Sequence, residues 1–313
     1  MQRAYLAGIE VSRVILGCGN FGGIGSAPDL FGKGESRDEA FTILDAAWDA
    51  GITTFDTADA YGGGRSETYL GDWLRSRRPE GAVLTTKTFN PMGRGEDHGL
   101  APARVRRQFE SSLHRLGVER VDLYLPHAWD GDVPWPETAG VLDELVAAGK
   151  IGAYGVSNVG GAELQEALAG GRPQWVQDSY SLLDRDVEPE VLPLCRARGL
   201  GFTPFSPLAG GWLTGKYRRD APPPAGSRMT LRPQPYEHLR TDAVYDALEQ
   251  LERLGDPATL ALAWLFAQPV VTAVVVGPRR PEQLRPALAA LDAAIDADAI
   301  GALFAPSGSA SEL

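Results

Sequence analysis

The chain has 313 residues, of which 43% are hydrophobic and 23% charged, and its formal net charge is −11. This composition is ordinary for a globular protein with a large core, and the acidic balance argues against nucleic acid or an anionic membrane as a partner. The two cysteines, Cys18 and Cys195, offer no disulfide framework, which favours a cytoplasmic protein. No Cys–His spacing typical of a zinc site occurs, and no apolar run approaches the roughly 20 residues of a membrane span, so neither a metal nor a membrane is expected.

The pattern of apolar runs predicts an α/β fold. Residues 5–12, with Gly8 in their middle, predict a small N-terminal β-hairpin that is expected to plug a barrel floor. Eight strand candidates follow, each short and continuously apolar, as in parallel strands covered on both faces: residues 14–18, 53–56, 83–86, 123–125, 153–156, 175–178, 201–204 and 271–276. Helix patterns such as Phe41, Leu44 and Trp48 separate them. This alternation predicts a closed (β/α)8 TIM barrel, one domain over residues 1–313 with a frayed tail from about residue 307.

Two long segments interrupt this alternation. Residues 91–102 follow the third strand and residues 208–240 follow the seventh, and both are rich in glycine, proline and charge. Long loops in compact domains are usually functional, so we expect both at the C-terminal face of the barrel as active-site loops. Together with residues 22–35 and 129–136, they are the candidates for setting substrate specificity.

Four polar residues lie at the ends of strand candidates. Asp56 ends the second strand and Tyr61 follows it, whereas Lys87 and His127 lie at the ends of the third and fourth. Because the carboxyl ends of barrel strands share one face, these side chains are expected to converge. A phenol beside a cation loses its proton more easily than free phenol, so Tyr61 is suited to protonating a carbonyl oxygen while a hydride arrives from elsewhere. Taken singly, none of these residues would indicate catalysis, and Asp56, for example, is a common residue in turns and helix caps. Only their joint position at the strand ends favours catalysis.

Seven sequence motifs occur in an order that resembles the aldo-keto reductase superfamily. They are FDTADAYGGGRSE, LTTKT, DLYLPH, GVSN, VQDSYSLLDR, SPLAGGWLTGKY and VVVGPRRPEQL. The resemblance implies a (β/α)8 barrel without a metal, with a nicotinamide cofactor lying across the carboxyl ends of the strands. It also implies that the catalytic residues are Asp56, Tyr61, Lys87 and His127.

The same resemblance implies which residues contact the cofactor. Ser157 and Asn158 match the pair that holds the nicotinamide carboxamide, with help from Gln177, and Phe205 matches the ring that stacks on the nicotinamide. The other implied contacts are Asn20, Phe21 and Asp56 near the first strands, Pro207, Leu208, Gly210, Leu213 and Lys216 at the pyrophosphate, and Gly277, Arg279 and Gln283 at the adenosine phosphate. For Arg228, a contact with the 2′-phosphate and a plain loop charge are both open alternatives.

The end of the eighth strand bears on the choice between NADPH and NADH. Arg279 and Arg280 form a local cationic cluster that favours the extra phosphate of NADPH, although NADH is also possible. A helix is expected to begin at Pro281 and to add favourable partial charge there. Family members usually have an acid and an amide that contact adenine where this chain has Pro286 and Ala287, so the two arginines are candidates to replace those contacts.

The leading functional hypothesis is NADPH-dependent reduction of an aldehyde or ketone to an alcohol, with Tyr61 as the general acid. Its rival is a regulatory or sensor subunit that binds NADPH with little turnover, as the resemblance to channel-associated family members implies. The presence of His127 beside the other three residues favours the enzyme. A small-molecule carbonyl compound is the expected partner, and a monomer is the default assembly.

Overall fold

The structure, a computed structural model, describes residues 1–305 of the chain. The expected fraying from about residue 307 concerns residues that lie outside this described part. No helix within the described part is both long and apolar enough to cross a membrane.

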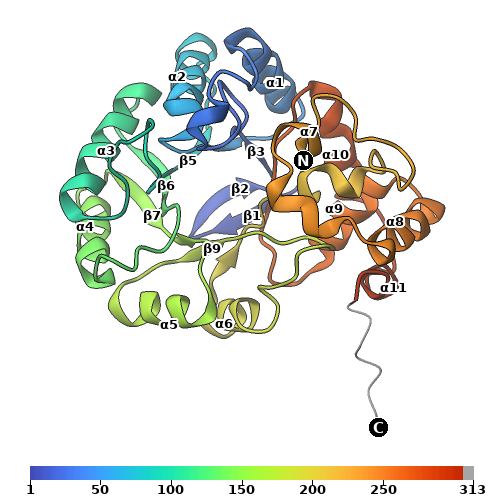
Figure 1. The fold of residues 1–313 in the computed structure, drawn as a ribbon. Helices are drawn as coiled ribbons and strands as arrows, with labels where there is room; N and C mark the ends of the chain where they lie inside the picture. Colours follow the sequence, from blue (N-terminus) through green and yellow to red (C-terminus); the bar gives the residue numbers. More distant parts are fainter. Residues whose placement is uncertain (306–313) are drawn as a thin grey trace.

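The centre of the fold is a ring of parallel strands in chain order (Figure 1). Its members are β3 (Val14–Gly17), β4 (Thr54–Asp56), β5 (Val83–Thr88), β6 (Val121–Pro126), β7 (Ile151–Tyr154), β8 (Val156–Ser157), β9 (Trp175–Gln177), β10 (Gly201–Phe202) and β11 (Val274–Val276). β3 pairs with β11. The Thr272 amide donates to the Phe202 carbonyl at 2.8 Å, and this bond closes the ring between β10 and β11.

One barrel strand is divided into two halves. β7 pairs with β6 and β8 pairs with β9, and only Gly155 separates the two halves. A side chain on Gly155 would place its Cβ 2.4 Å from the carbonyl oxygen of Trp175, so glycine is required for this close approach. Counting β7 and β8 as one strand, the eight strand candidates of the sequence are confirmed as a (β/α)8 barrel.

Helices surround the strands (Figure 1). They are α1 (Arg37–Asp49), α2 (Arg65–Arg77), α3 (Pro102–Leu116), α4 (Trp135–Ala147), α5 (Gly161–Gly170), α6 (Val191–Arg198), α8 (Asp242–Leu254), α9 (Pro257–Ala267), α10 (Arg285–Ala290) and α11 (Ala297–Ala302). α1 begins with a capping box, in which the Ser36 side chain accepts from the Glu39 amide and the Glu39 carboxylate accepts from the Ser36 amide. α3 ends at Gly117, which has a left-handed φ of 70° that glycine adopts without strain.

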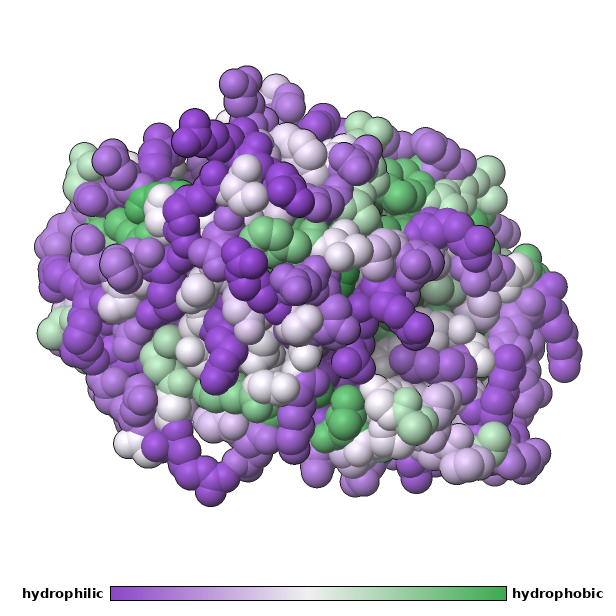
Figure 2. Space-filling view, turned by 90° about the horizontal axis from the view of Figure 1, so that it is seen from above, coloured by the Kyte–Doolittle hydropathy of each residue, from purple (hydrophilic) through white to green (hydrophobic). Residues whose placement is uncertain are grey.

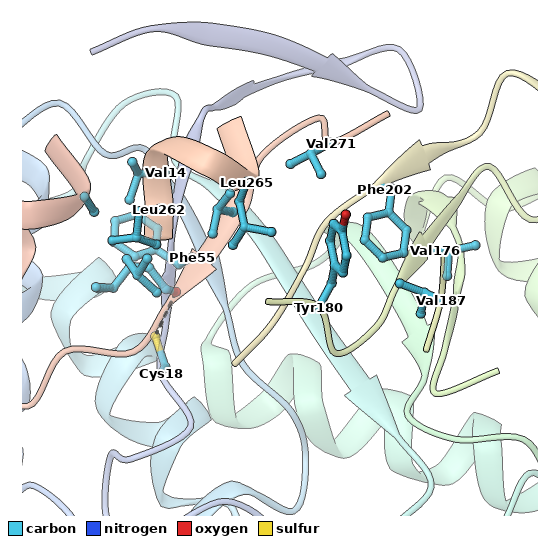
Figure 3. Packing of buried hydrophobic residues seen from close by; sticks show 14 of the residues in the cluster. Val14, Cys18, Phe55, Val176, Tyr180, Val187, Phe202, Leu262, Leu265 and Val271 are labelled. Carbon is cyan, nitrogen blue, oxygen red and sulfur yellow. Dashed lines mark hydrogen bonds between the residues drawn. The ribbon is translucent and has the colours of Figure 1, made fainter. Parts of the chain in front are cut away.

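The hydrophobic core has two parts. One lies between strands and helices, where Figure 3 shows Leu262 of α9 beside Val14 and Phe55 of the neighbouring strands. The other fills the barrel interior and includes Leu6 and Val11 from the hairpin formed by β1 (Arg3–Leu6) and β2 (Ile9–Ser12). Because these two hairpin residues are buried in the inner cluster, the hairpin closes the barrel floor, as expected. Burying one such side chain stabilises the fold by about 1.5–3 kcal/mol.

The long segment 208–240 contains more structure than a plain loop. It forms η3 (Ala209–Thr214), α7 (Arg228–Leu231) and η4 (Gln234–Leu239). Tyr217 holds the first two together, because its hydroxyl donates to the Gly210 carbonyl at 3.2 Å and accepts from the Met229 amide at 3.3 Å. These polar contacts between distant turns have no periodic signature in the sequence.

The face seen in Figure 2 is mostly polar, with hydrophobic residues scattered in small groups. Within residues 1–305, the large hydrophobic side chains that are strongly exposed are Met1, Tyr5 and Leu254. Met1 precedes β1, Tyr5 lies in the N-terminal hairpin and Leu254 ends α8 (Asp242–Leu254), so no single element carries more than one of them.

Candidate active site

The four residues at the strand ends come together. The Lys87 Nζ atom donates to the Asp56 Oδ2 atom at 2.6 Å and to the Thr57 carbonyl at 2.9 Å. The Tyr61 hydroxyl lies 3.3 Å from the His127 Nε2 atom, and the Lys87 Nζ atom lies 5.1 Å from the centre of the Tyr61 ring. A phenol therefore lies between an ammonium and an imidazole, with a carboxylate behind the ammonium.

Burial divides these four residues into two pairs. Lys87 and Asp56 are 1% and 3% exposed, whereas Tyr61 and His127 are half-buried. Burial alone would lower the pKa of Lys87, but the interactions with Asp56 and Tyr61 together outweigh it and the pKa is raised. Lys87 is therefore a permanent cation whose charge is directed at the phenol.

The phenol itself is less acidic than the sequence suggested. Desolvation raises the pKa of Tyr61, and the nearby Lys87 ammonium counteracts this effect only in part. The expected lowering by Lys87 is present, but burial outweighs it. Tyr61 consequently keeps its proton at neutral pH, which is the state that a proton donor needs.

His127 is held neutral. Burial of the ring and repulsion by Lys87 lower its pKa to about 3. The Asn90 Nδ2 atom lies 3.1 Å from its Nδ1 atom, and its backbone amide donates to the Thr88 carbonyl at 2.9 Å. At physiological pH, His127 can therefore donate or accept a hydrogen bond, but it carries no charge.

The residues expected at the nicotinamide adjoin this group. Gln177 donates to the Asp56 Oδ1 atom at 3.0 Å, and Asn158 donates to the His127 carbonyl at 2.7 Å. Asn158 has a left-handed φ of 53°, which asparagine tolerates better than most residues. Ser157 is buried and accepts from the Asn158 amide at 3.1 Å, and Phe205 is half-buried at the barrel's inner cluster.

Three cations gather at the other end of the expected cofactor site. The pKa of Lys216 is lowered by desolvation and by repulsion from Arg228 and Arg279, so the three lie within electrostatic reach of one another. Arg228 donates to the Asn20 Oδ1 atom at 2.8 Å, and Arg279 donates to the buried Glu35 carboxylate at 2.6 Å. The only partner carboxylate recorded for this group within residues 1–305 is Glu35, which leaves net positive charge.

The remaining expected contacts differ in how accessible they are. The side chains of Phe21 and Leu213 are completely buried in the core. Gly210 has a left-handed φ of 63°, and the Gln283 Oε1 atom accepts from the Arg279 amide at 2.7 Å. The other positions are mixed: Pro207 is buried, Leu208 is half-buried, and Gly277 is exposed.

The helix expected at Pro281 begins there, but as one turn of 3-10 helix, η5 (Pro281–Leu284). The α-helical part starts only at Arg285, so little helix dipole can act on a phosphate. Ala287 is 1% exposed and faces the core, which agrees with its offering no polar contact to adenine.

A family model described as the aldo/keto reductase family matches residues 13–305. The chain belongs to the aldo/keto reductase family. It is 36% identical to the uncharacterized oxidoreductase YrpG of Bacillus subtilis, over 95% of this chain and 93% of that protein. It is 34% identical to the NADH-specific methylglyoxal reductase of Escherichia coli, over 96% of both chains. The structure of the glycerol dehydrogenase AKR11B4 from Gluconobacter oxydans matches with a TM-score of 0.83 at 27% identity, over 97% of this chain and 95% of that one.

This aldo-keto reductase is therefore an oxidoreductase that acts on small carbonyl compounds with NAD(P)H. Within residues 1–305, no group of three or more His, Cys, Asp or Glu side chains is arranged to hold a metal ion.

Sequence reasoning missed several side chains that organise the site of this reductase. They are Asn90 beside His127, Glu35 beside Arg279, and the buried residues Asp59 and Arg104, which both bond to the Thr88 hydroxyl one position after Lys87. Asp59 was detectable in principle, because it stands three residues after Asp56 in the motif DTAD. The other pairs join segments whose spacing follows no secondary-structure period.

Asp59 predicts a pH dependence of stability. It is fully buried, it accepts from the Thr88 hydroxyl at 2.6 Å, and its Oδ1 atom has no partner within residues 1–305. Desolvation and repulsion by Glu67 raise its pKa to about 7. A raised carboxyl pKa stabilises the fold fully below about pH 4, and this contribution is lost as the pH rises through about 7.

We therefore expect Asp59 to lower the free energy of unfolding by about 1.4 kcal/mol per pH unit within that window. Denaturant titrations at several pH values would measure this slope, and Asp59→Asn should remove it. Asp298→Asn, on the surface of α11, serves as a control and should leave the slope unchanged. An Asp59→Asn slope equal to that of the unmodified enzyme would contradict the assignment.

Proposed function

We propose that this aldo-keto reductase reversibly reduces an aldehyde or ketone to an alcohol with NADPH, and that Asp56, Tyr61, Lys87 and His127 carry out the proton transfer. The observation that carries the proposal is the protonated Tyr61 hydroxyl held 3.3 Å from His127 and beside the buried Lys87–Asp56 pair. We further propose that the whole chain acts as one domain and works as a monomer in the cytoplasm.

The proposed mechanism gives each side chain one task. The chemistry supplied by bound NADPH is hydride transfer to the carbonyl carbon. Tyr61 donates its phenolic proton to the carbonyl oxygen, and Lys87 stabilises the phenolate that results. Asp56 holds Lys87 in place and balances its charge, while His127 offers a hydrogen bond to the carbonyl oxygen.

The cationic group of Lys216, Arg228 and Arg279 supports a phosphate-bearing cofactor. Desolvation and the repulsion of Arg228 and Arg279 lower the pKa of Lys216, so an anion bound among these three cations would relieve that repulsion. Gly277 adds to the fit, because a side chain there would meet only the Gly17 carbonyl at 3.6 Å and the Asn20 amide at 3.9 Å, so the backbone is open to close approach. Lys216, Arg228 and Arg279 would thus hold the cofactor phosphates.

We expect NADPH to bind at least about 10-fold more tightly than NADH. The 2′-phosphate adds up to about two negative charges, and each arginine–phosphate pair contributes about 1.5–3 kcal/mol. Arg279→Ala should narrow the difference, whereas Arg253→Ala, which removes an exposed charge from α8, should not. Fluorescence titration with both cofactors measures the ratio.

Equal dissociation constants for NADPH and NADH in the unmodified enzyme would contradict this preference. A weak preference for NADPH would have a parallel in the family, because one relative is described as an NADH-specific methylglyoxal reductase. It would leave the reductase assignment intact, because hydride transfer needs only the nicotinamide.

The substrate is proposed to be a small polar carbonyl compound. The relatives described as methylglyoxal reductase and glycerol dehydrogenase are named for a three-carbon carbonyl compound and a three-carbon alcohol, respectively. A panel of aldehydes and ketones, scored by kcat/KM from NADPH absorbance, tests the proposal. A regulatory subunit with little turnover is the second candidate, and turnover of any panel member at an ordinary enzymatic rate would exclude it.

A further inference from the structure

We propose that Asn90 is a positioning residue that fixes the tautomer of His127 and so keeps the Tyr61 proton free for the substrate. The proposal rests on the proposed function, because it concerns the direction in which that proton is given.

The contact between the two side chains decides the tautomer. The Asn90 Nδ2 atom lies 3.1 Å from the His127 Nδ1 atom, and an amide nitrogen can only donate. Nδ1 must then accept, so the proton of the neutral imidazole resides on Nε2. That Nε2 atom lies 3.3 Å from the Tyr61 oxygen.

The tautomer in turn controls the phenol. When His127 donates from Nε2, the Tyr61 oxygen accepts, and the phenolic proton remains available for a carbonyl oxygen. In the opposite tautomer Nε2 would accept, and Tyr61 would direct its proton to His127 instead. The Asn90 side-chain amide thus determines whether Tyr61 can donate its proton to the substrate or donates it to His127.

Asn90 is held rigidly enough for this task. Its backbone carbonyl accepts from Arg104 at 2.8 Å, and Arg104 is 3% exposed. The same guanidinium donates to the Thr88 hydroxyl and the Gly99 carbonyl, both at 3.0 Å. This buried arginine ties the segment after Lys87 to helix α3, so several bonds hold the backbone segment that carries Asn90.

Few other groups compete for His127. The charged or titratable side chains that face it are Tyr61 from η2 (Tyr61–Gly63) and Lys87 from β5, with Asp56 of β4 paired behind Lys87. Asn158 contacts only its backbone carbonyl. None of these groups donates to Nδ1, so Asn90 is the group that keeps the proton on Nε2.

The tautomer can be read directly by ¹⁵N NMR of the full chain labelled at histidine, with His127→Gln assigning the signal. We expect His127 to carry its proton on Nε2 in the unmodified enzyme. Asn90→Asp replaces the donor by an acceptor of the same shape, and the proton should then move to Nδ1. A proton on Nδ1 in the unmodified enzyme, or no shift in Asn90→Asp, would overturn the proposal.

Activity provides the second measurement. Asn90→Asp should lower kcat about 10²-fold near pH 8, as loss of one preorganised donor does, and should recover part of it as the pH falls, because a carboxylate favours the doubly protonated imidazole. Asn90→Ala should lose less activity without this recovery, and cofactor affinity should stay the same in both variants. Unchanged kcat in both would overturn the proposal. Absence of all carbonyl turnover in the unmodified enzyme would instead contradict the proposed function, while the NMR result would still test the role of Asn90.

Discussion

Replacing Tyr61 by phenylalanine is expected to lower kcat by about 10²-fold or more while leaving cofactor affinity unchanged. The change removes one oxygen and its proton, which no other side chain near the reacting carbonyl can replace. Burial keeps that proton on the phenol at neutral pH, so Tyr61 is protonated at the start of each turnover in the unmodified enzyme. Steady-state kinetics and a fluorescence titration with NADPH measure the two quantities.

The matched control for this change is Tyr5→Phe. Tyr5 is 70% exposed in the hairpin at the opposite end of the barrel, so the same chemical change there should leave kcat unchanged. Unchanged turnover in Tyr61→Phe would remove Tyr61 from the mechanism. A fall in kcat accompanied by loss of cofactor binding would point to a structural effect instead.

Lys87→Met is expected to affect both stability and catalysis. The variant leaves the Asp56 carboxylate buried at 3% exposure without its 2.6 Å ion-pair partner. Breaking a buried pair in this way costs about 3–5 kcal/mol in the free energy of unfolding. The phenolate formed during reduction also loses its neighbouring cation, so kcat should fall by about 10²-fold or more.

The double variant Asp56→Asn, Lys87→Met separates these two effects. Removing the carboxylate charge as well should recover much of the lost stability, because no uncompensated charge remains buried. Activity should remain low, since the cation is still missing. Denaturant unfolding and kcat measured on the same preparations give both values, and restored activity in the double variant would contradict the role given to Lys87.

The sequence was sufficient to predict the barrel and its four polar strand ends. Strands covered on both faces appear as continuous apolar runs, and each run stops where the chain meets the open face. Asp56 and Lys87 lie in β4 and β5, Tyr61 begins η2 after β4, and His127 follows β6, which brings all four to one end of the barrel. The hairpin was equally accessible, because its turn carries Gly8 with a φ of 77°.

Pairings between distant side chains were not accessible in this way. Arg279 and Glu35 are 244 positions apart, and Asn90 and His127 are 37 apart, so no helical or strand period links them. The acidity of Tyr61 also depends on how far burial outweighs Lys87, which only the packed structure decides. The burial of the Phe21 ring in the core was likewise not accessible from its motif position, so any contact of Phe21 with the cofactor would be made by its backbone.

The most direct measurement is a single-turnover experiment that follows the oxidation of enzyme-bound NADPH after rapid mixing with small aldehydes, including methylglyoxal. We expect the unmodified enzyme to oxidise its bound NADPH within about one second, as a kcat of roughly 1 per second or more requires. Tyr61→Phe should bind the same amount of NADPH and oxidise it about 10²-fold more slowly or worse. Bound NADPH that stays reduced in the unmodified enzyme with every aldehyde and ketone tested would contradict the assignment as a carbonyl reductase.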